Sequence, residues 1–436
     1  MSLVDLAKQD GRAWSRVGDS YGVTKKPRDL NVRSHATVPF IPMESVPQGG
    51  SYEPSFVLKK PDALTSGTYF ERGDVLVAKI TPSFENGKQA LVHSLPLPFG
   101  YATTEVIPLH PLDTKPDPRL LFFYLLHPDI RHYVAERMEG STGRQRVPEN
   151  VLLDLMMPNI ESEDQNRIAD SLERVQTAIT VENQAAKNAQ GLKQAAMREL
   201  FTRGLRGEAQ KDTEIGPVPE SWVPTTVVNL GEVKGGKRMP KGISLVAEDT
   251  GRPYLRVTDF RDHSIRDTGI LYVPEGYETV IQRYRISSRD VYISIAGSIG
   301  LVGQVPVHLD DANLTENAAK IVVSREDVLP RFLMYALASD ACQDQIDRAT
   351  AKNAQPKLAL TRIEQVLVPF PTTLEEQREI VTILDTVDRK IALHRQKRVV
   401  LEDLFQSLLH KLMTGEIRVT DLDLSALQAA NPGANP

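Results

Sequence analysis

The segment GEVKGGKR, from Gly231 to Arg238, comes closest to a motif that binds a nucleotide. Gly231, Gly236 and Lys237 have the spacing of a P-loop, in which backbone N–H groups and a lysine hold phosphate groups. The next position of a P-loop is Ser or Thr, which binds Mg²⁺, but here it is Arg238. The segment that follows, MPKGISL, has no helix start. A nucleotide-dependent enzyme that uses the Gly231–Lys237 loop therefore stays open only as an alternative function.

Other catalytic and metal-binding motifs are absent from the sequence. An adenine methyltransferase needs an Asn/Asp-Pro-Pro-aromatic motif for the flipped base, and the nearest stretch, NPGANP near the C-terminal end, does not fit. There is no His-Glu-x-x-His motif, and a single cysteine, Cys342, excludes a disulfide framework and a cysteine zinc site. We therefore expect no catalytic residue, no metal site and no cofactor bound by this chain.

Several basic and amide residues could instead contact DNA. A glycine-interrupted basic loop, for which a plain solvated loop is the alternative, contains Lys234, Lys237, Arg238 and Lys241. Two polar-basic loops, STGRQRV and ATAKNAQPKL, carry amide side chains that are able to bind adenine through two hydrogen bonds. Their candidate residues are Arg144, Gln145, Arg146, Lys352, Asn353, Gln355 and Lys357. Weaker candidates, on or beside expected strands, are Lys79, Arg256, Thr258 and Arg261.

Length and composition are those of a globular protein. The 436 residues, 41% of them hydrophobic and 25% charged, predict two or more domains. No run of eighteen apolar residues occurs and the N-terminal stretch lacks the apolar core of a signal peptide, so we expect a cytoplasmic protein. The net charge of −5 argues weakly against nucleic-acid binding. A local basic surface is enough for such binding, however, and a partner would then supply much of the phosphate neutralisation.

The sequence contains an internal repeat. The stretch PNIESEDQNRIADSLERVQTAI recurs as PFPTTLEEQREIVTILDTVDRKI, and Gln165 is answered by Gln377 at a step of 377 − 165 = 212 residues. The same step relates Ile168, Leu172, Val175 and Ile179 to Ile380, Leu384, Val387 and Ile391. Polar residues outside this apolar set match as well, for example Gln194 and Gln406. The repeat is therefore a duplication rather than chance periodicity.

Each copy of the repeat predicts a long amphipathic helix. Apolar residues recur at alternating steps of four and three, the a/d pattern of a coiled coil, over about 40 residues or about 60 Å. Alanines such as Ala186 and Ala189 replace larger residues in the upstream copy, which suits two helices packed on each other. A surface helix or a dimerisation coiled coil is the alternative for each helix alone. In an antiparallel pair with mirrored register, Glu182 falls opposite Arg398, and we predict an ion pair between them.

The segments before the two helices match more loosely. ERGDVLVAKI recurs as SSRDVYISIA, and Thr104-Glu105 recurs as Thr315-Glu316. Alternating stretches with glycine turns predict strands, and RLLFFYLLHPDIRHYVAERM predicts helices. Each half is therefore expected to be a mixed α/β globule followed by one long helix. Two related globules joined to rigid helices would suit two reading heads on duplex DNA, with a protein-binding coiled-coil adaptor as the alternative.

Three stretches resemble one known family. KDTEIGPVPESWVPTTVVNLGEV is similar to the entry into the second target-recognition domain of specificity (S) subunits of type I restriction–modification systems. PTTLEEQREIVTILDTVDRKI and LFQSLLHKLMTGEIRV resemble the C-terminal conserved helix of that family. Trp14 followed by VGDSYG looks like the shorter counterpart of Trp222 followed by NLGEV. The first helix departs most from the pattern, since alanines replace larger residues and RGLRG replaces TGEIRV.

The resemblance implies an α+β fold. Two mixed α/β target-recognition domains, related by a pseudo-twofold axis, would be separated by two long antiparallel helices that form a coiled coil. The first domain and its helix would occupy residues 1–160 and 161–210, and the second pair residues 211–371 and 372–419. Residues 420–436 would form a flexible C-terminal tail.

The resemblance also implies a non-catalytic role in a multisubunit methyltransferase and endonuclease. Each recognition domain would read one half of a bipartite, asymmetric sequence in double-stranded DNA. The helices would set the length of the unread spacer and dock two methyltransferase subunits, which bring S-adenosylmethionine. Two motor-nuclease subunits would use ATP and Mg²⁺.

Overall fold

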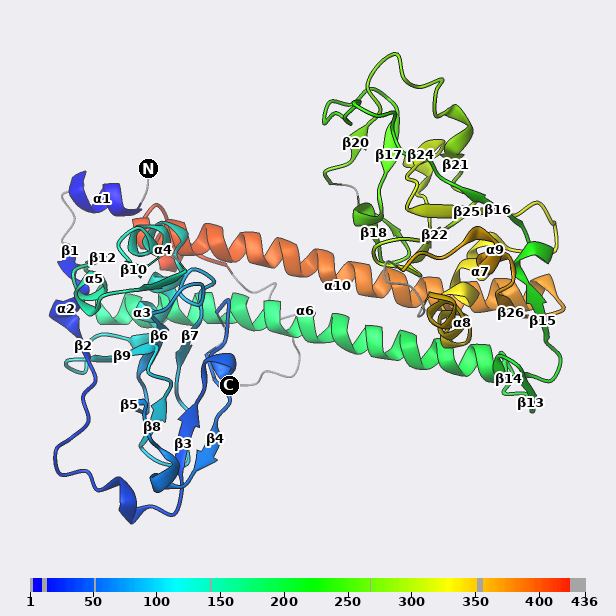
Figure 1. Ribbon diagram of the computed structural model, residues 1–436. Helices are drawn as coiled ribbons and strands as arrows, with labels where there is room; N and C mark the ends of the chain where they lie inside the picture. The colour runs from blue at the N-terminus through cyan, green and yellow to red at the C-terminus, as the bar shows by residue number, and fades with distance from the viewer. Residues whose placement is uncertain are drawn as a thin grey trace. The chain divides into compact units, whose positions relative to one another are not determined.

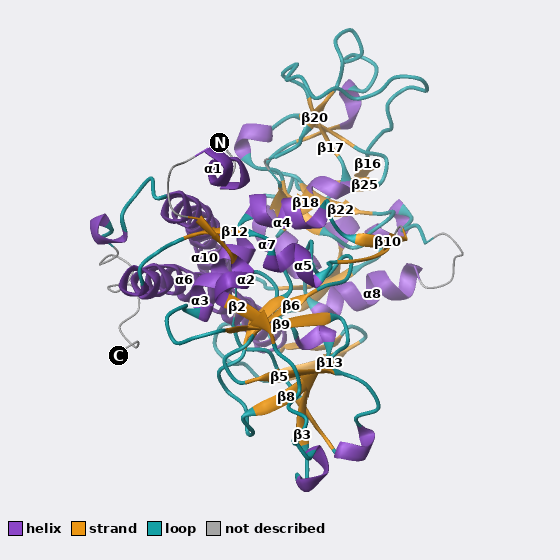
Figure 2. Cartoon of the chain, turned by 90° about the vertical axis from the view of Figure 1, so that its left-hand side faces the viewer, coloured by secondary structure: helices purple, strands orange, loops and turns teal. Residues whose placement is uncertain are grey.

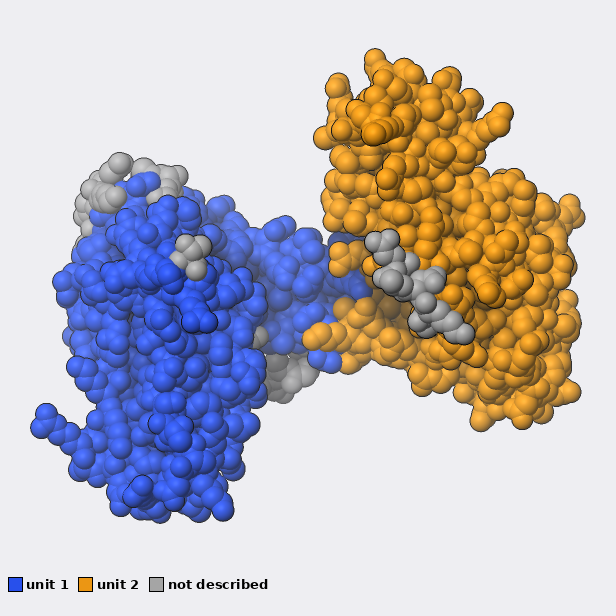
Figure 3. All heavy atoms as spheres, in the orientation of Figure 1, with its two compact units in different colours: residues 1–185, 393–436 blue, residues 186–392 orange. Residues whose placement is uncertain are grey.

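The structure is a computed structural model, and it describes residues 3–9, 14–50, 52–141, 143–266, 268–350 and 356–423. The chain forms two compact units, which have different colours in Figure 3. The first comprises Met1–Ala185 and Leu393–Pro436, and the second comprises Ala186–Ala392. Each unit thus contains one globule and a part of each of the two long helices, α6 and α10, which are labelled in Figure 1.

The globule of the first unit is built on two four-stranded sheets. One has the order β2 (Tyr21–Val23), β9 (Val106–Pro111), β6 (Val75–Ala78) and β7 (Gln89–Leu91). The other has the order β4 (Val57–Lys59), β3 (Val38–Ile41), β8 (Phe99–Ala102) and β5 (Thr68–Glu71). All neighbours are antiparallel except β3 and β8, which are parallel. Two further pairs are β1 (Trp14–Arg16) with β12 (Met156–Pro158), and β10 (Glu139–Ser141) with β11 (Arg144–Arg146).

The second unit repeats this plan. Its first sheet has the order β16 (Glu232–Gly235), β25 (Ala318–Val322), β22 (Val291–Ser294) and β23 (Val302–Gln304). Its second has the order β20 (Leu271–Tyr272), β17 (Pro253–Leu255), β24 (Ala312–Leu314) and β21 (Arg285–Ile286), and β17 is again parallel to its neighbour β24. The smaller pairs are β15 (Val223–Thr226) with β26 (Leu367–Phe370), β13 (Gln210–Thr213) with β14 (Gly216–Pro219), and β18 (Phe260–Arg261) with β19 (Ser264–Ile265). The duplication seen in the sequence is therefore a duplication of fold.

One buried helix forms the centre of each globule. In α3 (Pro118–Leu126) every residue from Leu120 to Leu126 is buried, and in α7 (Pro330–Leu337) every residue from Phe332 to Leu337 is buried. A helix that is apolar on all sides can lie only inside a core. The remaining short helices are α1 (Leu3–Gln9), α2 (Val17–Ser20), α4 (Pro128–Ala135), α5 (Glu149–Leu153), α8 (Asp340–Thr350) and α9 (Leu360–Glu364).

The helices α6 (Ser162–Arg203) and α10 (Leu374–Thr414) are the long helices expected from the repeat, and Figure 2 shows them side by side. In the first unit the beginning of α6, with Ile168 and Leu172, shares a core with the end of α10, with Leu408 and Leu412. In the second unit the end of α6 shares a core with the beginning of α10. The helices therefore run antiparallel, as predicted, in each unit. Within the described residues, no helix is both long and apolar enough to cross a membrane.

The contacts that join each globule to its helix are also duplicated. The Gln165 side chain accepts a hydrogen bond from the backbone N–H of Asp117 (2.9 Å), and Gln377 accepts one from the backbone N–H of Leu329 (2.8 Å). The step from Asp117 to Leu329 is again 329 − 117 = 212 residues. The same step relates the ion pair of Arg119 with Glu173 (3.1 Å) to that of Arg331 with Asp385 (2.8 Å). The repeat thus preserves individual side-chain contacts.

One predicted contact is wrong. Glu182 pairs with His394 (2.5 Å) and Lys397 (3.7 Å), whereas Arg398 pairs with Glu402 on its own helix (3.5 Å). His394 lies one helical turn before Arg398, so the observed register differs by about one turn at this point. A second polar contact between α6 and α10 joins Lys193 to Asp388 (2.7 Å), and both side chains are largely buried.

Candidate nucleic-acid interface

In the first unit, the predicted loop around Ser141 is a β-hairpin of β10 and β11. Backbone hydrogen bonds join it to the segment after β6, from Thr81 N–H to the Gln145 carbonyl (3.0 Å) and from Val147 N–H to the Lys79 carbonyl (2.8 Å). These bonds bring together three of the predicted residues, because Lys79 lies beside Gln145 and Arg146. Lys79 and Gln145 are half-buried, whereas Arg144 and Arg146 are exposed.

Arg146 forms the strongest polar contact at this hairpin. Its Nε and Nη2 donate to the two carboxylate oxygens of Glu105, at 2.9 and 2.8 Å. Glu105 lies in the turn between β8 and β9, and the hydrogen bond from Arg146 keeps the pKa of its carboxyl below the usual range. The carboxylate is therefore ionised at neutral pH, and the guanidinium is held by a charge-assisted, two-point contact.

In the second unit, the basic loop begins in a strand. Lys234 lies in β16 and pairs with Glu232 (2.7 Å), and the Lys237 ammonium lies 5.8 Å from the centre of the Tyr284 ring. Arg238 donates from Nε to Glu316 (2.5 Å) and, like Lys241, is exposed. Burial raises the pKa of Glu316, but the hydrogen bond from Arg238 and its other hydrogen bonds outweigh this and lower it.

The alternative of a nucleotide-binding loop is not favoured by this geometry. A P-loop is a loop that leads into a helix, whereas Glu232–Gly235 is a strand paired with β25. Gly236 follows with a strand-like hydrogen bond from its N–H to the Ala318 carbonyl (3.0 Å). The glycine is needed for close packing, since a Cβ there would lie 2.0 Å from the Thr315 carbonyl oxygen.

The second polar-basic loop is only partly described. Lys352, Asn353 and Gln355 lie outside the described residues, whereas Lys357 is described and exposed. Lys357 forms a β-bridge with Ala296, and Arg146 forms the corresponding bridge with Ile80. Lys357 and Arg146 therefore occupy equivalent positions of the two units.

The weaker candidates of the second unit have different surroundings. Arg256 donates to the fully buried Asp259 from Nε (2.9 Å) and Nη2 (2.7 Å), so its main contact is within the fold. Thr258 is exposed beside it. The side chain of Arg261 is 72% exposed, and its Nε lies 4.0 Å from a carboxylate oxygen of Asp262. Arg261 and Thr258 are thus accessible to a ligand, whereas Arg256 would first have to leave Asp259.

The sequence comparison missed one basic segment. Val23 pairs with Leu109 and Val233 pairs with Ile321. Leu109 and Ile321 are equivalent, because they pair with Val75 and Val291 at the same point of β6 and β22. The exposed segment after β2, which contains Lys25, Lys26 and Arg28, is therefore equivalent to the basic loop after β16. The cluster TKKPR could have been noticed in the sequence, but its equivalence follows only from the strand register.

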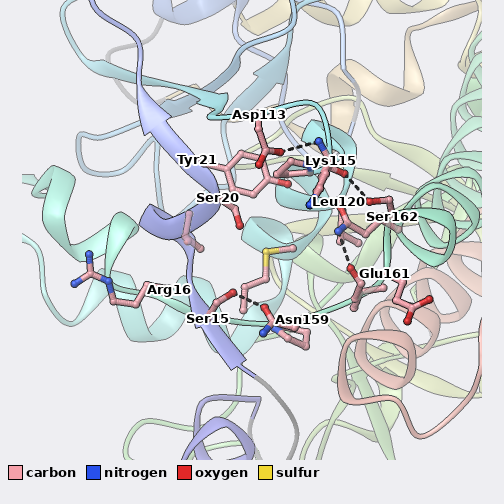
Figure 4. A pocket seen from close by; sticks show the side chains of 16 residues that line it. Ser15, Arg16, Ser20, Tyr21, Asp113, Lys115, Leu120, Asn159, Glu161 and Ser162 are labelled. Atoms are coloured by element: carbon pink, nitrogen blue, oxygen red, sulfur yellow. Dashed lines mark hydrogen bonds between the residues drawn. The ribbon is translucent and has the colours of Figure 1, made fainter.

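A pocket of about 480 Å³ lies where the first globule meets the start of α6 (Figure 4). Its polar groups bond to one another, since Ser15 donates to Asn159 (2.5 Å) and Asp113 accepts from the Lys115 backbone N–H (2.8 Å). Ser162 in the first turn of α6 donates to the Lys115 carbonyl (3.2 Å). These bonds fasten the start of α6 to the globule.

One group of side chains within the described residues has the composition of a metal site, namely His127, Asp129 and His410. Nδ1 of His127 accepts the backbone N–H of Asp129 (3.2 Å), so the ring proton lies on Nε2, which faces Nδ1 of His410 at 3.1 Å. Burial lowers the pKa of His127 to about 4. The hydrogen bond between the two imidazoles accounts for this arrangement, and it links the α3–α4 junction to the C-terminal part of α10.

Comparison with known proteins gives one consistent result. Residues 219–403 match the family model described as the type I restriction modification DNA specificity domain. The putative MjaX specificity subunit of a type I restriction enzyme from Methanocaldococcus jannaschii is 26% identical over 356 residues, 80% of this chain and 79% of that protein. The MjaVIII specificity subunit of the same organism is 23% identical over 310 residues, 70% of this chain and 71% of that protein.

A solved structure extends the likeness to the fold. The S subunit of a type I restriction–modification system from M. genitalium matches with a TM-score of 0.57 and 15% identity, over 93% of this chain and 97% of that chain. The repeated plan of sheets and the antiparallel helices therefore belong to a fold that this S subunit shares. The chain is thus similar, in sequence and in fold, to specificity subunits of type I restriction–modification systems.

Proposed function

We propose that this chain is the sequence-specific DNA-binding, non-catalytic subunit of a type I restriction–modification complex. Residues 1–160 and 211–371 are the two target-recognition domains, and each reads one half of a bipartite, asymmetric sequence. Residues 161–210 and 372–419 are the conserved helices that set the unread spacer, and residues 420–436 are a tail.

The observation that carries this proposal is a constant scaffold with variable loops. The two units have the same strand order in both four-stranded sheets, including the same single parallel pair. The turns that carry Glu105 and Glu316 differ, since an arginine of β11 meets one acid and an arginine after β16 meets the other. A duplicated scaffold with divergent polar loops is what reading two different half-sites requires.

The distribution of charge supports DNA as the ligand. Exposed cations gather on the loops that leave β2, β11 and β16, although the chain as a whole carries a net charge of −5. Such a local basic surface can contact phosphates, but binding by this chain alone would be weak and would fall steeply with salt. Partners that add positive charge would then strengthen it.

The outer faces of the long helices support docking of partner proteins. Leu393 and Val400 of α10 lie seven residues apart, hence on one helix face, and are 50% and 60% exposed. Exposed aliphatic side chains on a helix that already buries its other face are typical of a second interface. We propose that two methyltransferase subunits, which bring S-adenosylmethionine, bind there. Two motor-nuclease subunits that use ATP and Mg²⁺ would complete the complex in the cytoplasm.

An exchange of recognition domains tests the proposal. Residues 211–371 would be replaced by the corresponding domain of a related specificity subunit whose methylated motif is known, and cells that express the chimera with its modification subunits would be sequenced for methylated bases. We expect one half of the bipartite motif to change and the other half to stay. A motif that is unchanged, or changed in both halves, would contradict the proposal, and so would the absence of any motif for the unaltered chain.

A further inference from the structure

Each unit carries an acid in the turn between two equivalent strands, but at neighbouring positions of that turn. The Thr103 N–H donates to the Ile41 carbonyl as the Thr315 N–H donates to the Leu255 carbonyl, so Glu105 corresponds to Asn317, and the sequence match of Glu105 with Glu316 is wrong by one residue. Glu105 lies between β8 and β9, and Glu316 lies between the equivalent strands β24 and β25. Both side chains are partly enclosed, with exposed fractions of 23% and 26%. Glu316 is fixed further, because Oε2 accepts from the hydroxyl groups of Thr315 (3.0 Å) and Tyr254 (3.4 Å).

Each acid holds an arginine, but the two arginines come from non-equivalent elements. Arg146 belongs to β11, and its equivalent in the second unit is Lys357. Arg238 follows β16, and its equivalent in the first unit is Arg28, because Val23 corresponds to Val233 and each arginine lies five residues later. Neither ion pair is duplicated, since the position of Glu105 is Asn317 in the second unit and that of Glu316 is Thr104 in the first. Each pair therefore belongs to the part of the fold that differs between the units.

The exposure of the pairs indicates which partner is presented to a ligand. The side chains of Arg146 and Arg238 are 51% and 77% exposed, more than twice the values of their acids. In Arg146, Nε and Nη2 face Glu105, and within the described part of the chain no acceptor lies within hydrogen-bond distance of Nη1. A guanidinium has five donors in a plane, so its Nη1–Nη2 edge still faces outward.

That free edge has a definite complement in DNA. The O6 and N7 atoms of guanine, at the edge of the major groove, accept two parallel hydrogen bonds from a guanidinium. An arginine held along its Nε–Nη2 edge loses little conformational freedom when it makes this contact. A carboxylate near DNA repels phosphates, so the presence of one in a DNA-binding turn of each unit needs a compensating benefit, and orientation of the arginine provides one.

We infer that Glu105 and Glu316 are positioning residues that hold Arg146 and Arg238 for two-point contact with a guanine, one in each half of the recognised sequence. This inference rests on the proposed DNA-reading function. Under this inference the two arginines that pair with an acid contact bases. Exposed cations that have no such acid, such as Lys241 and Arg144, contact phosphates.

The inference is tested by determining the DNA motif that the complete complex methylates when this chain carries Glu105→Gln or Glu316→Gln. We expect each substitution to lower discrimination at a single G·C position by about tenfold or more, in one half of the motif only. Because a negative charge is removed, binding to non-specific DNA should be unchanged or stronger. Arg146→Lys and Arg238→Lys, which keep the charge but lose the planar fork, should relax the same positions.

Asp327→Asn is a matched control. Asp327 accepts from Nε (2.9 Å) and Nη2 (2.6 Å) of Arg325, the same two-point geometry, but lies before α7 and outside the candidate DNA-binding loops. We expect its motif to equal that of the unaltered chain. If the Glu→Gln variants alter affinity equally for all sequences, or leave the motif intact, the arginines do not read bases and the inference fails. Should a Glu→Gln variant melt early, the exposed Arg→Lys variants decide the question. A missing motif in the unaltered complex would instead refute the proposed function.

Discussion

At the scale of single residues, the duplication preserves individual polar contacts as well as the apolar periodicity of the helices. Gln165 and Gln377 match in the sequence because each side chain satisfies backbone groups of the segment before its helix, from Asp117 in one unit and from Leu329 in the other. A buried backbone group without such a partner would cost about 1–3 kcal/mol, so the glutamine is hard to replace. The reason for the match could not be seen in the sequence, since each contact spans 48 residues.

His127 is a position at which the two units differ. The repeat places Ser339 at the equivalent position (339 − 127 = 212), and both residues stand immediately before a helix of their unit, α4 or α8. The Ser339 hydroxyl donates to the Ala336 carbonyl (2.6 Å), whereas His127 is a buried titratable group whose pKa is lowered to about 4. The first unit should therefore respond to acid at a point where the second unit does not.

We predict that His127→Ser reduces the sensitivity of unfolding to acid. The unfolded chain binds a proton at His127 below the ordinary histidine pKa of 6.5, and the folded chain only below about 4, so stability is lost as the pH falls through this window. The loss amounts to about 3 kcal/mol at most. Asp74 acts in the opposite direction, because burial raises its pKa to about 6. The two proteins share Asp74, so the difference in their unfolding free energies between pH 7 and pH 4.5, measured with urea, isolates the histidine. Parallel curves for the two proteins would contradict the prediction.

At the scale of secondary-structure elements, the long helices were predictable and the sheets were not. Most apolar a/d positions predicted from the sequence, including the small residues Ala186 and Ala189, are buried, and others such as Ile179 and Val387 are half-buried, because helix periodicity depends on neighbouring residues only. Strand pairing is non-local: the parallel pair of β3 and β8 joins residues 61 apart (101 − 40), and no local pattern specifies it. The same holds for the Glu105–Arg146 contact, since its partners come from different elements.

The polar contacts between the helices show the limit of register prediction. The sequence places Glu182 and Arg398 on the facing sides, and both are indeed partly buried there. Glu182 instead pairs with His394. His394 and Arg398 are four residues apart and lie on the same face of α10, so Glu182 could pair with either of them. Periodicity thus determines which face is buried, while packing determines which turn lies opposite.

We predict that Ala189→Leu destabilises the protein, because Ala189 is only 8% exposed in the seam between α6 and α10. Three additional carbon atoms must then displace side chains that are already packed, at a cost of about 1–3 kcal/mol. Ala195→Leu is the matched control, since Ala195 is exposed on the same helix and its substitution should cost less than about 0.5 kcal/mol. Urea unfolding followed by circular dichroism measures both. Equal midpoints for the two variants would show that the alanines are not required for close packing.

At the scale of the whole molecule, both long helices pass from one compact unit into the other. The boundary falls between Ala185 and Ala186 in α6 and between Ala392 and Leu393 in α10. Two polar contacts between the helices fall within the units, since Glu182 meets His394 in the first and Lys193 meets Asp388 in the second. Residues inserted at both boundaries would therefore leave these two contacts intact, and we expect the helices to tolerate lengthening without a change in either globule.

We predict that insertion of three heptads at both boundaries lengthens the unread spacer of the methylated motif by about nine base pairs and leaves both half-sites unchanged. Twenty-one residues add about 31 Å at 1.5 Å per residue, close to the roughly 34 Å of one turn of DNA, and whole heptads keep the a/d phase.

A single heptad at both boundaries adds only about 10 Å, or about three base pairs, which rotates one half-site about the DNA axis by about a quarter of a turn or more. That variant should fold equally well by circular dichroism and methylate poorly, because the second domain no longer meets the major groove. If the three-heptad variant methylates the original motif with its original spacer, the helices do not set the spacing.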